Sequence, residues 1–283
     1  MRVDAHQHFW RLADRAGAWP PPALAAIHRD FGPDDLAPLL RGAAIDATVL
    51  VQSLPSLADT HALLALARAT PFVRGVVGWV DMKARDAADT IATLARDPLL
   101  KGLRPMLQDL GDDAWIADPA TAPAAEAMAR HGLVFDALVL PRQLPALHVF
   151  AVRHPALAIV IDHAAKPAVA PVVPEPWRHD MARLAALPNL RCKLSGLLTE
   201  AGAGARRADL QPCVQALWEA FGPARLVWGS DWPVLLLAAG YADWHAMSEA
   251  LLDAVTPPAT PADRAAVFGG NAVALYRLEG PPC

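Results

Sequence analysis

The sequence contains few cysteines and no close pair of them. Its three cysteines, Cys192, Cys213 and Cys283, are scattered through 283 residues without a CxxC spacing. This usage predicts neither a disulfide framework nor a zinc-finger site. It is typical of a protein of the reducing cytoplasm, so we expect a cytoplasmic location.

Long runs of charge and long apolar runs are also missing. The formal net charge of -4 comes from interspersed acids and bases, which gives no electrostatic footprint for nucleic acid or an anionic membrane. The N-terminal residues MRVDAHQHFW lack the apolar stretch of a signal peptide, and no segment approaches the roughly 20 apolar residues of a membrane span. We therefore expect a small-molecule partner, with neither nucleic acid nor membrane; the sequence gives no indication of oligomeric state.

What the chain does have is a repeated alternation of short β-branched runs with Ala- and Leu-rich segments of helical spacing. The predicted strands are Arg2–His6, Ala47–Gln52, Val73–Val80, Gly102–Pro105, Leu133–Ala137, Leu157–Asp162, Leu190–Leu194 and Leu226–Gly229. The predicted helices between them include Leu57–Ala69, Asp86–Arg96, Pro119–Arg130, Leu144–Arg153, Pro176–Ala186 and Arg207–Phe221. Eight βα units without a G-x-G-x-x-G turn predict an α/β protein, a single-domain (β/α)8 TIM barrel over residues 1–283, and not a doubly wound sheet.

Two kinds of irregularity carry further expectations. The proline-rich stretches Trp19–Pro22 and Pro167–Pro176 flank predicted strand ends, so we interpret them as active-site loops. The last predicted helix, Pro261–Leu278, contains Gly269-Gly270-Asn271, which is costly inside a helix. We expect a bend or a tight helix–strand contact there.

Polar residues stand at several strand ends, where barrel enzymes place their catalytic groups. The first strand ends in Asp4-Ala5-His6-Gln7-His8, and alternation puts His6 and His8 on the same side, where they can bind one divalent metal. An ordinary pair of hydrogen-bonded histidines is the equally weighted alternative. His163 follows the sixth strand, and Asp231 follows the eighth, where it can bind metal or accept a proton from water.

Other strand-end residues are candidates for substrate binding. They are Gln52, Trp79, Arg104, Asp136, Lys193 and Trp232. A carboxylate inside an apolar strand, as at Asp136, favours a functional role. Arg104 and Lys193 suit an oxygen-rich ligand, but either is equally a salt-bridge partner for Asp136 or Asp162. The tryptophans suit a sugar face or simple packing, again with equal weight.

Taken in order, several motifs resemble the amidohydrolase-2 family from end to end. They are Asp4-Ala5-His6-Gln7-His8-Phe9-Trp10, Gly102-Leu103-Arg104-Pro105, Ile161-Asp162-His163-Ala164-Ala165-Lys166-Pro167, Cys192-Lys193-Leu194-Ser195-Gly196 and Trp228-Gly229-Ser230-Asp231-Trp232-Pro233. Within the family the chain is similar to the sugar-lactone hydrolase branch, typified by L-fuconolactonase and L-rhamnonolactonase.

The resemblance implies an enzyme that opens a sugar-acid lactone, such as an L-fuconolactone-like aldonolactone, to the aldonic acid. It implies Asp231 as general base and His163 as a catalytic residue, with one divalent ion, Zn²⁺, on His6, His8 and Asp231. Binuclear members carry other residues where this chain has Arg104 and Asp136, so we expect at most one ion; metal-free action remains the alternative. A metal-dependent decarboxylase and a non-catalytic carbohydrate-binding barrel are the rival functions.

Overall fold

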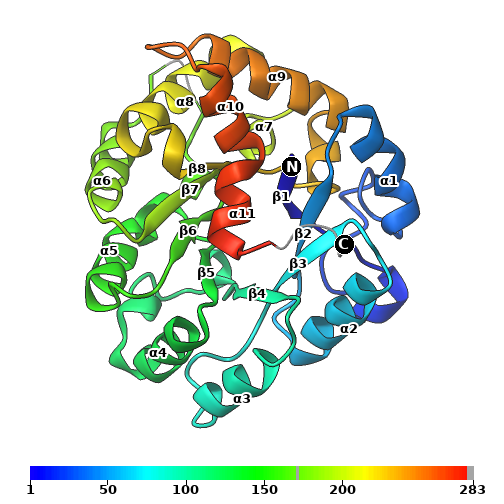
Figure 1. Cartoon of the computed structure of the whole chain (residues 1–283), viewed down its shortest axis with the longest axis vertical. Helices are drawn as coiled ribbons and strands as arrows, with labels where there is room; N and C mark the ends of the chain where they lie inside the picture. The colour runs from blue at the N-terminus through cyan, green and yellow to red at the C-terminus, as the bar shows by residue number, and fades with distance from the viewer. Residues whose placement is uncertain (170–171, 279–283) are drawn as a thin grey trace.

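The fold is a barrel of eight parallel strands in the order in which they occur in the chain, as predicted (Figure 1). The computed structural model describes residues 1–169 and 172–278. The strands are β1 Val3–Gln7, β2 Ala47–Val51, β3 Val73–Gly78, β4 Leu100–Leu103, β5 Val134–Ala137, β6 Ile159–Ile161, β7 Leu190–Leu194 and β8 Leu226–Trp228. The ring closes just past β8, where the Asp231 N–H donates to the His6 carbonyl at 2.8 Å and the His8 N–H to the Trp232 carbonyl at 2.8 Å.

One strand lies earlier in the chain than predicted. The expected strand Gly102–Pro105 is β4, Leu100–Leu103. Pro105 has no N–H for the ladder, which ends the strand. Gly102 lies inside β4, and this position needs glycine because a Cβ there would lie 2.7 Å from the Val134 carbonyl oxygen on β5.

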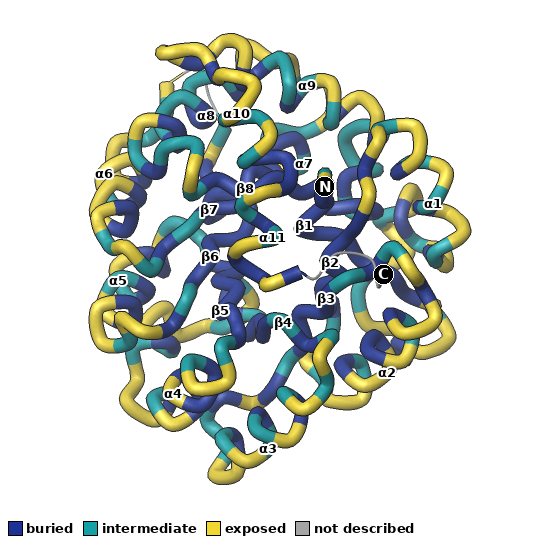
Figure 2. Tube along the Cα trace, viewed as in Figure 1, coloured by how far each residue is buried: buried dark blue, intermediate teal, exposed yellow. Residues whose placement is uncertain are grey.

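Helices surround the barrel, with their outer faces exposed and their inner faces buried against the strands (Figures 1 and 2). They are α1 Pro33–Gly42, α2 Leu57–Arg68, α3 Ala87–Leu94, α4 Ala122–His131, α5 Leu144–Arg153, α6 Glu175–Ala185, α7 Leu197–Ala201, α8 Arg207–Phe221, α9 Tyr241–Asp253, α10 Pro261–Ala265 and α11 Asn271–Tyr276. All the helices predicted between strands are present, and α1, α7 and α9 were not among them. Over the described ranges, no helix has the length and apolar character needed to cross a bilayer.

The last helix closes the N-terminal end of the barrel. In Figure 1, α11 lies across the centre of the ring of strands. Its Leu275 and Tyr276 pack with small and β-branched side chains inside the barrel, such as Val3 and Val134. The Tyr276 hydroxyl reaches far enough to donate to Asp136 Oδ2 at 2.8 Å. The barrel interior is therefore filled from below by the C-terminal helix.

The glycines of this last segment have the packing role that was expected. The predicted helix Pro261–Leu278 is divided into α10, a π-helical turn over Ala266–Gly270, and α11. A Cβ at Gly269 would overlap the Met1 carbonyl oxygen and lie 3.0 Å from the Arg2 Cα. The expected tight contact between this helix and the first strand is confirmed.

Candidate active site

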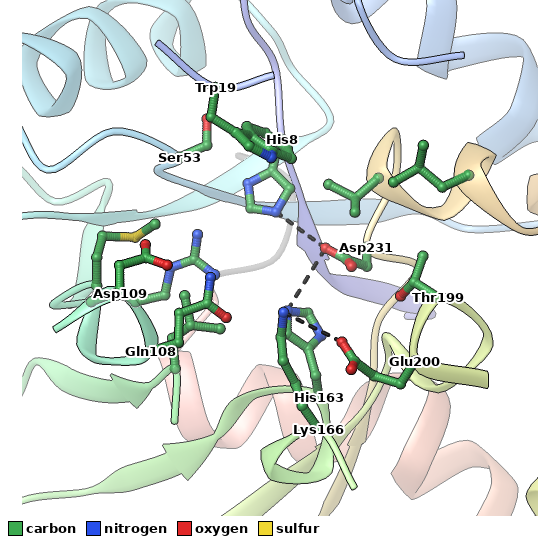
Figure 3. Close-up of a pocket in the computed structure, with 15 residues that line it drawn as sticks. His8, Trp19, Ser53, Gln108, Asp109, His163, Lys166, Thr199, Glu200 and Asp231 are labelled. Atoms are coloured by element: carbon green, nitrogen blue, oxygen red, sulfur yellow. Dashed lines mark hydrogen bonds and ion pairs between the residues drawn. The ribbon is translucent and has the colours of Figure 1, made fainter. Parts of the chain in front are cut away.

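Three histidines surround the carboxylate of Asp231 at the C-terminal face of the barrel. Figure 3 shows two of them, His8 and His163, on either side of Asp231. Asp231 Oδ1 lies 3.2 Å from His8 Nε2, 3.7 Å from His6 Nε2 and 3.8 Å from His163 Nε2. His6 belongs to β1, His8 follows it, and His163 and Asp231 follow β6 and β8. The structure thus brings together every residue predicted as catalytic or as a metal ligand.

The donor set suits a divalent metal ion. His6, His163 and Asp231 each offer one ligand atom, and these atoms lie within 4.8 Å of one another. Two nitrogens and one carboxylate oxygen are a donor set that Zn²⁺ accepts. Among these three, His163 takes the place that the sequence gave to His8.

The tautomer of His8 supports the same fit. Its Nδ1 lies 2.7 Å from the Val51 carbonyl oxygen, which only accepts hydrogen bonds, so Nδ1 carries the proton. Nε2 of the neutral ring is then unprotonated, and its lone pair faces the Asp231 oxygen at 3.2 Å. Two acceptors at this separation need a cation or a proton between them.

Burial fixes the charge states of this cluster. Burial lowers the pKa of His163 to about 4 and also lowers the pKa values of His6 and His8. Burial alone would raise the pKa of Asp231, but the neighbouring histidines, His163 first, hold that pKa below its ordinary value. At neutral pH the site therefore holds neutral imidazoles around a carboxylate.

A left-handed turn aims His163 at the cluster. After β6, the consecutive residues His163, Ala164, Ala165 and Lys166 have φ values of 52°, 53°, 59° and 50°. Such a run of non-glycine residues in the left-handed region is uncommon and costs conformational energy. The turn is held from β7, because His163 Nδ1 lies 2.9 Å from Ser195 Oγ and the imidazole packs directly on Gly196.

Beneath the cluster lies a buried ionic network. Lys193 Nζ is 2.5 Å from Asp136 Oδ2, 3.0 Å from Asp162 Oδ1 and 3.1 Å from His6 Nδ1. Arg104 pairs with Asp162 at 3.3 Å and donates to the Gln52 carbonyl. Arg104 and Lys193 therefore form salt bridges with buried aspartates, which was one of the two roles considered for them from the sequence.

A cavity of about 570 Å³ opens above the cluster. It is lined by His8, Trp19, Ser53, Arg104, Met106, Gln108, Asp109, Leu138, His163, Lys166, Thr199, Glu200, Asp231, Val234 and Leu237. Of the six predicted substrate-binding residues, Arg104 alone is in this lining. Gln52, Asp136 and Lys193 are fully buried below it.

The two predicted tryptophans lie elsewhere. Trp232 is buried against Phe9 and Phe31, and Trp79 is half-buried just past β3, outside the cavity lining. Trp19 reaches the cavity instead, from the loop predicted at Trp19–Pro22. The other predicted loop, Pro167–Pro176, includes residues 170–171, and these, like Cys283, lie outside the described residues.

Several cavity residues were not predicted from the sequence, among them Gln108, Lys166 and Glu200. They belong to loops and short helical turns, where no periodicity indicates which way a side chain faces. Lys166 could have been predicted at the cavity, because it stands three residues after His163 in the segment that follows β6.

Paired histidines from the first strand and an aspartate after the last, at the C-terminal face of a closed (β/α)8 barrel, define a hydrolase-type barrel with a candidate metal centre. The chain belongs to the amidohydrolase family, whose model matches residues 3–278.

Two relatives cover almost the whole chain. An L-fucono-1,5-lactonase of Burkholderia ambifaria is 55% identical over 99% of this chain and 97% of its own length. A second L-fucono-1,5-lactonase, from Burkholderia multivorans, is 39% identical over the same shares. Among solved structures, an amidohydrolase from B. multivorans with bound Zn has a TM-score of 0.91 at 39% identity, covering 99% of this chain and 100% of that one.

Proposed function

We propose that this protein is a lactonase that hydrolyses an L-fucono-1,5-lactone-like sugar lactone to its aldonic acid. The full-length similarity to two L-fucono-1,5-lactonases supports this activity over the decarboxylase and the non-catalytic barrel. The observation that carries it is the Asp231 carboxylate within 3.8 Å of the ring nitrogens of three histidines, at the base of a cavity of about 570 Å³. We propose a cytoplasmic location from the cysteine usage.

Asp231 acts as the base in this mechanism. Its carboxylate removes a proton from a water molecule, which attacks the lactone carbonyl carbon. The C–O bond of the ring then breaks, and protonated Asp231 returns the proton to the leaving alkoxide. His163 and His8 flank this carboxylate, and Arg104, which lines the cavity, orients the carbonyl oxygen.

The buried predicted residues contribute from below in this proposal. Lys193 and Asp136 position the His6 ring, and Gln52 positions Arg104 by donating to the Arg104 carbonyl at 2.7 Å. Trp232 and Trp79 pack the walls of the barrel mouth.

The residues that would hold a divalent ion, for which Zn²⁺ is our candidate, are His6, His163 and Asp231, with His8 adjacent. When bound, the ion would supply a Lewis acid that polarises the lactone carbonyl. Elemental analysis of protein purified without chelator should give close to one Zn²⁺ per chain, and His6→Ala should lower that content. A wild-type protein that is metal-free, yet fully active in chelator, would assign the water activation to Asp231 alone.

The activity itself is tested by a pH-indicator assay with L-fucono-1,5-lactone. Wild-type protein should turn it over faster than unsubstituted δ-valerolactone, and Asp231→Asn should lose at least about a hundredfold in kcat, in line with the usual contribution of general base catalysis. Thermal unfolding serves as the control for folding. A folded Asp231→Asn variant with near-wild-type turnover would contradict the assignment.

A further inference from the structure

A charged pair on the cavity wall has no part in the chemistry above. We infer that Lys166 and Glu200 form a subsite that binds two neighbouring hydroxyl groups, a vicinal diol, of the substrate ring. The inference rests on the proposed function, because it takes the ring to be that of a sugar lactone. In Figure 3 both residues lie beside His163 on the same side of the cavity.

The pair is available to a ligand. Lys166 Nζ and Glu200 Oε1 are 3.4 Å apart, and their side chains keep 22% and 28% of their exposure. Within the described ranges, neither side chain makes another ion pair or hydrogen bond. Arg104, by contrast, is held in place by its pair with buried Asp162. A partly exposed pair of this kind, which makes no other such contacts, exchanges partners at lower cost than a buried pair.

The position of the pair relative to the reacting groups is fixed. The left-handed turn carries His163 and Lys166 together, and the hydrogen bond of His163 to Ser195 joins this turn to the segment that begins α7. Glu200 belongs to α7, whose N-cap Gly196 packs against the His163 ring. The diol subsite is therefore built on the same two elements that aim His163.

The chemistry of the pair matches a diol. A carboxylate accepts hydrogen bonds at two oxygens, and an ammonium group donates up to three. Two adjacent hydroxyls of a sugar ring can each donate to Glu200 while their oxygens accept from Lys166. Leu138, Val234 and Leu237 line the same cavity and offer apolar contact to the C–H and methyl groups of the ring. An unsubstituted lactone satisfies only the apolar part.

The kinetic experiment compares Glu200→Gln and Lys166→Met with wild type on L-fucono-1,5-lactone and on δ-valerolactone. Loss of a charged hydrogen bond should raise KM for the sugar lactone by about 10- to 100-fold, while kcat changes by no more than a few-fold. The loss in kcat/KM on δ-valerolactone should be at least about tenfold smaller. The matched control is Glu219→Gln, which breaks the exposed pair with Arg178 at 3.1 Å on the outer surface and should leave both substrates unaffected.

A binding measurement decides the subsite independently of turnover. Calorimetry should show that wild type binds L-fuconate more tightly than 5-hydroxyvalerate, and that Glu200→Gln removes most of this difference. If wild type hydrolyses no lactone, the proposed function fails, and the calorimetry still tests the subsite. Equal losses on both substrates, equal losses on both probes, or wild-type behaviour of both variants would overturn the diol subsite.

Discussion

Replacing Gly196 by alanine should displace His163 and remove most of the lactonase activity. Gly196 has a φ of +67° and stands directly against the imidazole. A Cβ at this position would lie 2.6 Å from His163 Nδ1 and 2.7 Å from Cγ. These separations are well inside van der Waals contact, so the ring must move.

The size of the effect follows from two contributions. The left-handed backbone costs an alanine about 1–2 kcal/mol. Overpacking against a buried ring adds roughly 1–3 kcal/mol. We expect the free energy of unfolding to fall by about 2–5 kcal/mol. We expect kcat/KM to fall about a hundredfold if the ring shifts by about 1 Å.

The chain offers a matched control at the other end of the same short helix. Gly202 has a φ of +84°, but a Cβ there would have nothing within 4 Å. Gly202→Ala should therefore lose stability only through its backbone, which at a ψ of 171° costs about 1–3 kcal/mol, and should keep its activity. Urea unfolding and the pH-indicator assay measure both variants. A Gly196→Ala variant as active as Gly202→Ala would refute the role given to this contact in aiming His163.

Other perturbations test the buried network and the acid behaviour of the fold. Lys193→Met leaves Asp136 and Asp162 without their shared cation and should cost about 3–5 kcal/mol in urea unfolding; a cost below that of Tyr276→Phe, about 1 kcal/mol, would contradict this. The pKa of His163 is about 4 in the folded chain and 6.5 in the unfolded chain, so between these pH values only the unfolded chain binds a proton at this residue. Stability should thus fall by about 2 kcal/mol from pH 7 to pH 5 through this residue, and His163→Gln should flatten that slope; an unchanged slope would count against it.

The barrel and its reacting groups could be predicted from the sequence because of the topology of the fold. Parallel strands place their C-terminal ends at one face, so residues that follow β1, β6 and β8 converge whatever their distance in the chain. His6 lies near the end of β1, His163 and Asp231 follow β6 and β8, and the alternation of the first strand added His8 to them. Short, continuous apolar strands sufficed for this part of the prediction.

The depth of inward-facing side chains inside the barrel could not be predicted from the sequence in the same way. Alternation shows that Asp136 and Lys193 face inward, but whether they reach the cavity or lie below it depends on how the strands are staggered against one another. The position of Lys166 depends on a left-handed turn through Ala164 and Ala165, a conformation that residue propensities argue against. Here tertiary contacts override the local preference.

The C-terminal helix also has a consequence for how the chain acquires its structure. Tyr276 seals the ionic network from below, and Gly269 packs against Met1, so the first and last parts of the sequence must meet. Contacts between such distant segments slow folding. During synthesis, Asp136 leaves the ribosome long before Tyr276, so its carboxylate stays open to water from the barrel floor. The buried charges beneath the active site therefore acquire their dry surroundings only after translation has reached α11.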